Sequence, residues 1–235
     1  MYKRQDLNKY IAPEHLQKTR RLSYLDQFRS NALKLIKING FLNPSFASKC
    51  TDFLSNEASY QDVYGLYRRY GDSVTKTEWL SSPEEQRFYF YQMLSGHKHS
   101  FSSNALRYME LRQLLLSIDF KHYIESIVGN RLGDITPIKT HRMQSQHFLK
   151  KHNDLTNNRV VAFIVYLSSN WHISNGGDLC IVDNDDIESQ LEPTFNSLTL
   201  FDVTQHKYHY VSKINDTKPS KQANRISING WFYEK

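Results

Sequence analysis

The chain has 235 residues, of which 39% are hydrophobic and 23% are charged, a composition that excludes a disordered protein. This length suits one domain with a full core, and we predict a single domain over residues 1–235. Residues 1–10 hold no apolar run and no later stretch is long enough to span a membrane, so we expect neither a signal peptide nor a transmembrane segment. Cys50 and Cys180 stand alone, which disfavours a disulfide framework and a zinc site and predicts a reducing, cytoplasmic location.

The net charge of +6 comes from scattered lysines and arginines. The densest basic cluster consists of Lys18, Arg20 and Arg21. A surface for nucleic acid is one interpretation of this cluster, but no nucleic-acid-binding motif accompanies it. We therefore favour a solvated helix face and expect no nucleic-acid partner and no membrane partner.

Residues 1–130 are expected to supply mainly helical support. The clearest start signal is Ser82-Pro83-Glu84-Glu85, in which Ser82 could act as the N-cap and Glu85 could complete a capping box. Tyrosines at near-helical spacing over residues 60–70 are expected to line the core or a groove rather than to bind a cofactor. Helices are predicted over residues 15–37, as one helix or two, and over residues 45–56, 82–94, 104–116 and 119–128, the last ending at Gly129.

His152 and Asp154 form an H-x-D pair. In an extended strand, side chains two residues apart project from the same face, so the imidazole and the carboxylate would lie side by side. Two such ligands can hold one edge of a metal ion, and a third ligand from elsewhere would complete a face. Two histidines and one carboxylate with open positions are typical of non-haem Fe(II) oxygenases. The tripeptide alone is common, so this interpretation depends on the sequence that follows it.

Residues 131–235 are expected to form a sandwich or barrel of short strands. Residues 159–167 are apolar almost throughout, as expected for a strand that is covered on both faces. Residues 183–188 are acidic, but the spacing of a calcium loop is absent, and we interpret them as a solvated loop. Further strands are predicted over residues 178–182, 197–203, 209–214 and 225–233.

Two histidines compete to be the third metal ligand. His209 opens a predicted strand, whereas His206 lies in a polar run that looks like a turn. If the strand were continuous, the odd spacing would place the two rings on opposite faces. We favour His209, because a strand positions a ligand better than a turn does. The alternative is that both are surface histidines.

The last predicted strand begins with a strict alternation. Arg225, Ser227 and Asn229 share one face, and isoleucines occupy the other. A guanidinium on the inward face would be costly unless it met an anion, and arginine forms a bidentate pair with a carboxylate. An arginine at a barrel mouth, paired with an acid such as Asp202, explains the same pattern equally well.

The H-x-D motif is one of several motifs that occur along the chain in a fixed order. They are His152-Asn153-Asp154, Arg159, Ile164-Val165-Tyr166-Leu167, Gly176-Gly177-Asp178-Leu179, Pro193, Asn196-Ser197-Leu198-Thr199-Leu200-Phe201, His209-Tyr210-Val211 and Arg225-Ile226-Ser227-Ile228-Asn229-Gly230-Trp231-Phe232, preceded by Asn39-Gly40-Phe41-Leu42-Asn43-Pro44. This ordered set resembles the 2-oxoglutarate and Fe(II)-dependent oxygenases, in particular their prolyl hydroxylase branch. The resemblance extends over residues 140–233.

The resemblance implies an α+β fold, a double-stranded β-helix of the jelly-roll or cupin type that N-terminal helices buttress. It implies Fe(II) held by His152, Asp154 and His209, and 2-oxoglutarate whose distal carboxylate is bound by Arg225 and Tyr166. The implied reaction uses O2 to hydroxylate an unactivated C–H bond, with release of succinate and CO2, and ascorbate is a candidate reductant. The implied substrate is a prolyl residue of a protein or peptide, or a small amino-acid-like molecule.

Two features depart from the family pattern. Relatives carry a tyrosine nine or ten residues before the first iron-binding histidine, where this sequence has Met143 and Arg142. The segment between His209 and Arg225 is longer than the pattern, and residues 210–224 could form a substrate lid or an inert surface insertion. The competing function is a non-catalytic, cupin-like binding module with a basic surface, which a complete metal triad with Arg225 would disfavour.

Overall fold

The computed structural model describes every residue except 1–3, 70, 98–101, 157 and 216–223. Its α-helices are α1 (Pro13–Leu16), α2 (Lys18–Ser30), α3 (Pro44–Asp52), α4 (Lys76–Ser81), α5 (Ser103–Leu115) and α6 (Ile118–Val128). Its strands are β1 (Leu35–Asn39), β2 (Ala58–Leu66), β3 (Ser73–Val74), β4 (Arg87–His97), β5 (Lys139–Met143), β6 (Phe148–His152), β7 (Arg159–Tyr166), β8 (Leu179–Val182), β9 (Glu188–Leu191), β10 (Ser197–Asp202), β11 (Tyr208–Val211) and β12 (Arg225–Tyr233).

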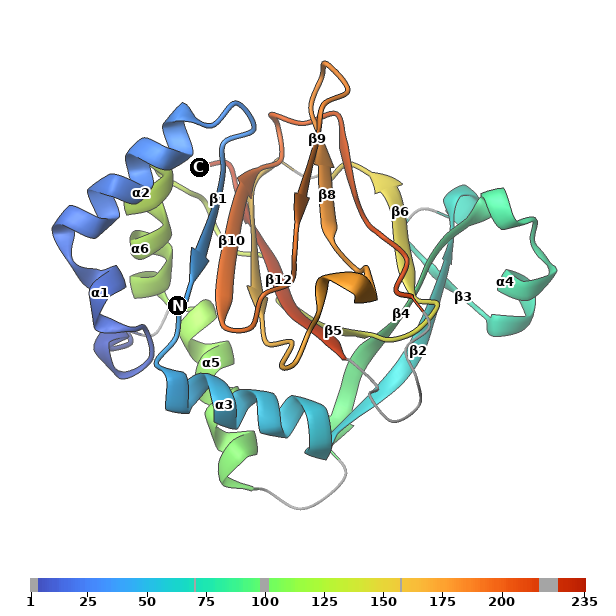
Figure 1. The fold of residues 1–235 in the computed structure, drawn as a ribbon, viewed down its shortest axis with the longest axis horizontal. Coiled ribbons are helices and arrows are strands. Elements are labelled where there is room, and N and C mark those ends of the chain that lie inside the picture. The colour runs from blue at the N-terminus through green and yellow to red at the C-terminus, as the bar shows by residue number, and fades with distance from the viewer. Residues whose placement is uncertain (1–3, 70, 98–101, 157, 216–223) are drawn as a thin grey trace.

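The strands form one antiparallel sheet that curls over itself. Its order is β1-β10-β7-β12-β5-β4-β6-β11-β8-β9, and β2 and β3 extend it beside β4. In Figure 1 the β8–β9 hairpin lies beside β10 and crosses β12, and the side chains of β8 pack against those of β7 and β10. Strands β1 to β4 come from the first 130 residues, so this part of the chain contributes to the sheet as well as to the helical support.

Strand β7 is buried on both faces, as its apolar sequence predicted. Phe163 and Val165 belong to the large core that the sheet shares with the helices. Ala162, Ile164 and Tyr166 point the other way, into the space between the two halves of the curled sheet. The period of two in β7 therefore separates a structural face from a face that is free to line a site.

Helices α2, α3, α5 and α6 cover the outer face of the sheet, whereas α4 lies beside β2. Figure 1 shows α2 and α6 together beside β1, with α3 and α5 below them. Helix α6 begins after Ser117, whose hydroxyl accepts a hydrogen bond from the Phe120 amide at 3.1 Å, and it ends at Gly129, whose φ of +81° suits glycine. The predicted helices over residues 104–116 and 119–128 are therefore confirmed. No helix among the described residues is long and apolar enough to cross a membrane.

The predicted helix over residues 82–94 is wrong. Ser82 does not cap a new helix, because its hydroxyl donates to the Glu78 carbonyl at 2.8 Å, at the end of α4. Only a short turn forms at Glu84–Gln86, and the chain then enters β4, which pairs with β2, β5 and β6. The aromatic run that opens β4 favours a sheet, and this preference outweighs a capping signal that is worth about 1 kcal/mol.

Three further expectations need adjustment. The predicted helix over residues 15–37 is a pair, α1 and α2, and β1 occupies its last residues. The tyrosine-rich stretch at residues 60–70 begins as strand β2. The H-x-D motif does not lie within one strand, because β6 ends at His152 and Asp154 follows in a loop.

The other predicted elements are present. The strands predicted over residues 159–167, 178–182, 197–203 and 225–233 correspond to β7, β8, β10 and β12, and the one over residues 209–214 is the shorter β11. The helix predicted over residues 45–56 corresponds to α3 and the turn that follows it. Most of the long segment between His209 and Arg225 lies outside the described residues, so its role as a lid stays a hypothesis.

Candidate active site

The three residues predicted as metal ligands lie together between the halves of the curled sheet. His152 of β6 and His209 of β11 are direct partners in the antiparallel ladder, with ring centroids 4.1 Å apart. Asp154 Oδ2 lies 3.3 Å from His209 Nε2, and Asp154 Oδ1 lies 3.9 Å from His152 Nε2. One possible ligand atom from each residue lies within 4.8 Å of the other two. Two imidazoles and a carboxylate suit Fe(II), so this group could hold that ion.

Neighbouring groups hold two of these side chains in place. His152 Nδ1 lies 2.9 Å from the Lys150 carbonyl and can donate to it, which leaves the lone pair of the ring on Nε2. Asp154 Oδ2 accepts a hydrogen bond from the Trp231 indole at 2.8 Å. Arg159 lies over the ring of Trp231, 4.5 Å from its centroid, with Nη1 3.7 Å from Asp154 Oδ1. The carboxylate is thus oriented from two sides.

The site favours the protonation states that a metal ion requires. Burial, together with the neighbouring His209, lowers the pKa of His152 to about 4, so its ring is neutral at pH 7. Burial alone would raise the pKa of Asp154, but the hydrogen bond and charge of His209, followed by His152 and Trp231, lower it below the usual range. Asp154 is therefore ionised at neutral pH.

His206 is not a surface histidine, and neither is His209, so that alternative is wrong. Both side chains are buried, and His206 is only 4% exposed. His206 Nε2 lies 2.9 Å from His209 Nδ1, on the side of the ring away from Asp154. Burial, followed by the effect of His209, lowers the pKa of His206 to about 4. The ring that joins His152 and Asp154 is that of His209, the residue favoured from the sequence.

Arg225 lies on the cavity face of β12 and is 3% exposed. Its Nε donates to the Gly177 carbonyl at 2.6 Å, and its Nη2 donates to the Tyr166 hydroxyl at 3.3 Å. Its Nη1 lies 3.6 Å from the sulfur of Met143. Within the described residues no salt bridge involves Arg225, so the pairing with Asp202 that the sequence left open does not form.

Both polar groups at this end of the site keep their ordinary charge at pH 7. Burial lowers the pKa of Arg225, and the nearby Tyr166 opposes that shift. A guanidinium nevertheless stays protonated in proteins. Burial raises the pKa of Tyr166, so its phenol stays protonated and can donate or accept a hydrogen bond.

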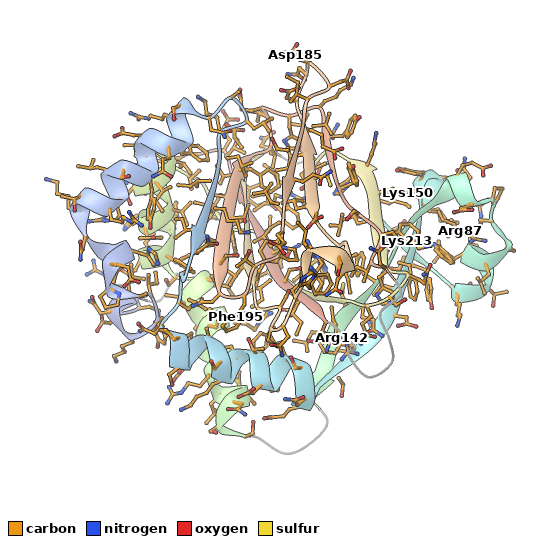
Figure 2. All side chains as sticks on the ribbon, in the orientation of Figure 1. Arg87, Arg142, Lys150, Asp185, Phe195 and Lys213 are labelled. Carbon is orange, nitrogen blue, oxygen red and sulfur yellow. The ribbon has the colours of Figure 1, made fainter. Side chains whose placement is uncertain are left out.

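Met143 and Arg142, which replace the tyrosine of the family pattern, point in opposite directions. Met143 is buried against Arg225. Arg142 donates to the Gln92 side chain at 2.7 Å and lies over the ring of Tyr60, 4.0 Å from its centroid. In Figure 2, Arg142 is labelled at the lower edge of the sheet beside β4. The thioether therefore takes the place near Arg225, and Arg142 is turned away from it.

A cavity of about 480 Å³ joins the triad to Arg225. Its size suits a small molecule, and most of its lining is apolar or aromatic. Burial, followed by the charges of Lys139 and Arg225, lowers the pKa of His141 in this lining to about 3. Residues of the lining from several strands are Phe88, Tyr89, Tyr91, His141, Ile164, Leu179, Val211, Asn229 and Trp231.

Three features of the site were missed from the sequence. Trp231 shares the face of Arg225 because it lies an even number of residues further along β12, and this spacing could have revealed it. Gly177 supplies a carbonyl at a φ of +73°, where an added Cβ would lie 3.1 Å from Arg225 Cδ, but its sequence signalled only a turn. The aromatic residues of β4 were hidden by the wrong helix prediction.

Comparisons with known proteins identify similar sequences over part of the chain. Residues 138–233 match the sequence model of the 2OG-Fe(II) oxygenase superfamily. The chain is 31% identical over 129 residues to prolyl 3-hydroxylase OGFOD1 of Mus musculus, covering 52% of this chain and 23% of that protein. It is 32% identical over 98 residues to prolyl 3-hydroxylase sudestada1 of Drosophila melanogaster, covering 37% and 18%. The matches thus span about a quarter or less of the length of these curated relatives.

Solved structures share the fold over nearly the whole chain. A prolyl-4-hydroxylase of Pseudomonas putida superposes with a TM-score of 0.57 at 17% identity, covering 92% of this chain and 99% of that one. A prolyl hydroxylase of Trichoplax adhaerens, solved with a peptide fragment of hypoxia inducible factor, superposes with a TM-score of 0.61 at 18% identity, covering 95% and 94%. The predicted α+β double-stranded β-helix is confirmed. Residues 138–233 thus match the 2OG-Fe(II) oxygenase superfamily, and the chain has the fold of solved prolyl hydroxylases.

Proposed function

We propose that the protein is an Fe(II)- and 2-oxoglutarate-dependent dioxygenase that hydroxylates a prolyl residue of a protein or peptide, with release of succinate and CO2. The observation that carries this proposal is one cavity that joins a two-histidine, one-carboxylate group to a buried arginine that forms no salt bridge with the described residues. The superfamily match over residues 138–233 supports it.

His152, Asp154 and His209 would hold Fe(II), which supplies O2 activation when 2-oxoglutarate is also bound. Three protein ligands leave positions open for other molecules. Because Asp154 supplies a carboxylate, no ligand position is vacated for a halide, and we expect hydroxylation rather than halogenation.

Arg225 would bind the distal carboxylate of 2-oxoglutarate. Its contacts with Gly177, Tyr166 and Met143 are all to uncharged groups, so its positive charge is available to an anion. The Tyr166 hydroxyl can add a hydrogen bond to the same carboxylate. The apolar side chains of Ile164 and Leu179 line the cavity and would limit the water that reaches this contact.

A prolyl substrate is supported by the aromatic side of the cavity. Tyr89 and Tyr91 of β4 and Trp231 of β12 line it, and flat aromatic rings suit a compact apolar ring such as proline. The curated relatives are named prolyl 3-hydroxylases, and the Trichoplax adhaerens structure holds a peptide. A small amino-acid-like molecule is the alternative substrate.

The test combines spectroscopy with turnover. Anaerobic addition of Fe(II) and then 2-oxoglutarate should produce the visible charge-transfer absorption of the chelated metal. Proline-containing peptides and free amino acids are then screened for coupled succinate release and a 16 Da gain in substrate mass. Absence of the absorption band would favour a non-catalytic binding module. Turnover of free amino acids but not of peptides would show that the substrate is a small amino-acid-like molecule.

Three expectations stay predictions from the sequence. They are the single domain over residues 1–235, the cytoplasmic location and ascorbate as the reductant.

A further inference from the structure

The two histidine rings of the triad are supported from behind in different ways. His152 Nδ1 lies 2.9 Å from the backbone carbonyl of Lys150. His209 Nδ1 lies 2.9 Å from Nε2 of a second imidazole, His206. A backbone carbonyl survives any side-chain substitution, whereas a supporting side chain can be replaced. The support of His209 is therefore open to direct test.

The direction of these hydrogen bonds follows from one backbone group. His206 Nδ1 lies 3.3 Å from the Asp202 carbonyl, which can only accept. Nδ1 of His206 therefore carries the hydrogen, and the neutral ring presents its lone pair at Nε2. That lone pair can accept from Nδ1–H of His209, so that a metal-bound His209 would use the lone pair on Nε2, the nitrogen facing Asp154. This is the tautomer that a metal ligand needs.

Packing against neighbouring side chains fixes His206 in this position. Its ring meets Phe201 edge-on, with centroids 5.6 Å apart, and Phe201 also packs against His209 at 5.4 Å. The turn that carries His206 is tied to the neighbouring strand, because the Lys207 amide donates to the Val182 carbonyl at 2.9 Å. The supporting ring is thus fixed by the sheet itself.

We propose that His206 is a positioning residue that sets the tautomer and the rotation of the His209 ring and thereby raises the affinity of the triad for its metal. This inference rests on the metal-binding part of the proposed function and on none of its substrate chemistry. Partners that orient metal-bound histidines typically change metal affinity by about 10- to 100-fold when they are removed.

The test is a titration of the metal-free protein with Co(II), whose visible absorption reports its coordination. His206→Phe keeps an aromatic ring against Phe201 but offers no acceptor, and it should weaken Co(II) binding by about 10- to 100-fold. His206→Gln offers an amide oxygen as the acceptor, and its affinity should stay within about threefold of the unmodified protein. His122→Phe, which removes an exposed histidine of α6, is the matched control and should leave the affinity unchanged.

The outcomes separate this inference from the proposed function. Unchanged Co(II) affinity in His206→Phe, or equal losses in the Phe and Gln variants, would overturn the role of His206 and leave the proposed function standing. Co(II) binding that survives both His152→Ala and His209→Ala would instead remove the metal site itself. A measurement that needs no variants is the assignment of the histidine tautomers by 15N NMR in the Zn(II)-loaded protein. A hydrogen on Nδ1 of His206 is expected, and a hydrogen on Nε2 would contradict the inference.

Discussion

The two ends of the cavity differ in how their charges are balanced. At the metal end, Asp154 has both histidines and the Trp231 indole within 3.9 Å. At the other end, Arg225 contacts a carbonyl, a phenol and a thioether, and no salt bridge among the described residues balances its charge. The metal end is therefore a preformed geometry, whereas the Arg225 end is a preformed charge. On the proposed function, fixed ligand positions would select the metal ion, and an unbalanced positive charge would attract the dicarboxylate.

The largest expected effect is the loss of Fe(II) affinity when a ligand at the metal end is removed. His152→Ala removes one of three ligands, so the loss in Fe(II) affinity should exceed the ~100-fold upper end seen for residues that only support a ligand. Succinate formation should fall with it. The measurement is anaerobic Fe(II) titration followed by turnover, with His122→Ala as the control. Full turnover by His152→Ala would show that His152, Asp154 and His209 are not the metal site.

The next largest effect is the loss of 2-oxoglutarate affinity when the charge of Arg225 is removed. Arg225→Ala removes a charge-assisted contact worth roughly 2–3 kcal/mol, so 2-oxoglutarate affinity should fall about 30- to 100-fold. Arg225→Lys should recover part of this loss through charge alone. Titration of 2-oxoglutarate into the Fe(II)-loaded protein measures both. Arg142→Ala is the matched control, because Arg142 contacts Gln92 and Tyr60 and not the cavity beside Arg225. If this variant lost 2-oxoglutarate affinity, Arg142 would be the residue that binds the distal carboxylate.

A smaller loss of metal affinity is expected when the residue that orients Asp154 is changed, and it tests whether the metal end is a fixed geometry. Trp231→Phe keeps an aromatic ring beneath Arg159 but removes the N–H that orients Asp154. Metal affinity should fall about tenfold, since this group supports a ligand without being one. Co(II) titration measures the change. A loss as large as that of His152→Ala would show that the indole does more than orient the carboxylate.

The fourth prediction concerns pH and the charged end. Burial, Lys139 and Arg225 hold the folded-state pKa of His141 at about 3, below its ordinary value of 6.5. Between these values the unfolded chain binds a proton that the folded protein does not, so stability rises with pH and is lost as pH falls. From pH 6.5 to 4.5 the contribution of His141 should fall by about 2 kcal/mol, at about 1.4 kcal/mol per pH unit.

Urea unfolding of the metal-free protein at the two pH values measures this loss. His141→Gln cannot take up the proton, so its pH-dependent loss should be smaller than that of the unmodified protein by about the same 2 kcal/mol. Identical losses in both proteins would mean that His141 is not held neutral beside Arg225.

Sequence patterns predicted the barrel half of the fold better than the first half. Strand β7 could be predicted from its nearly unbroken apolar run and β12 from the alternation at its start, because burial sets both patterns residue by residue. Strand β4 was not predicted, because Ser82 and Glu85 imitate a helix start, and the strand preference of the aromatic run after them becomes decisive through pairing with β2, β5 and β6. A long-range pairing of this kind leaves no mark in a local window.

The candidate site divides in the same way. His152, Asp154, His209 and Arg225 could be named from their side-chain chemistry and their order along the chain. The contribution of Gly177 could not, because it acts through a backbone carbonyl that any residue possesses. Nor could the contact between His206 and His209, because it depends on how the turn after β10 bends back towards β11.

Strand β12 carries both Arg225 and Trp231, so a single rigid element runs from one end of the cavity to the other. Six residues of extended chain measure about 20 Å between these two Cα atoms, and pairing with β5 over residues 225–229 and with β7 over residues 227–233 holds the strand in register. On the proposed function, β12 acts as a ruler between the guanidinium and the carboxylate of the metal end. A keto diacid longer by one methylene, such as 2-oxoadipate, would have to buckle to fit that fixed span, so the sheet would limit the length of the cosubstrate.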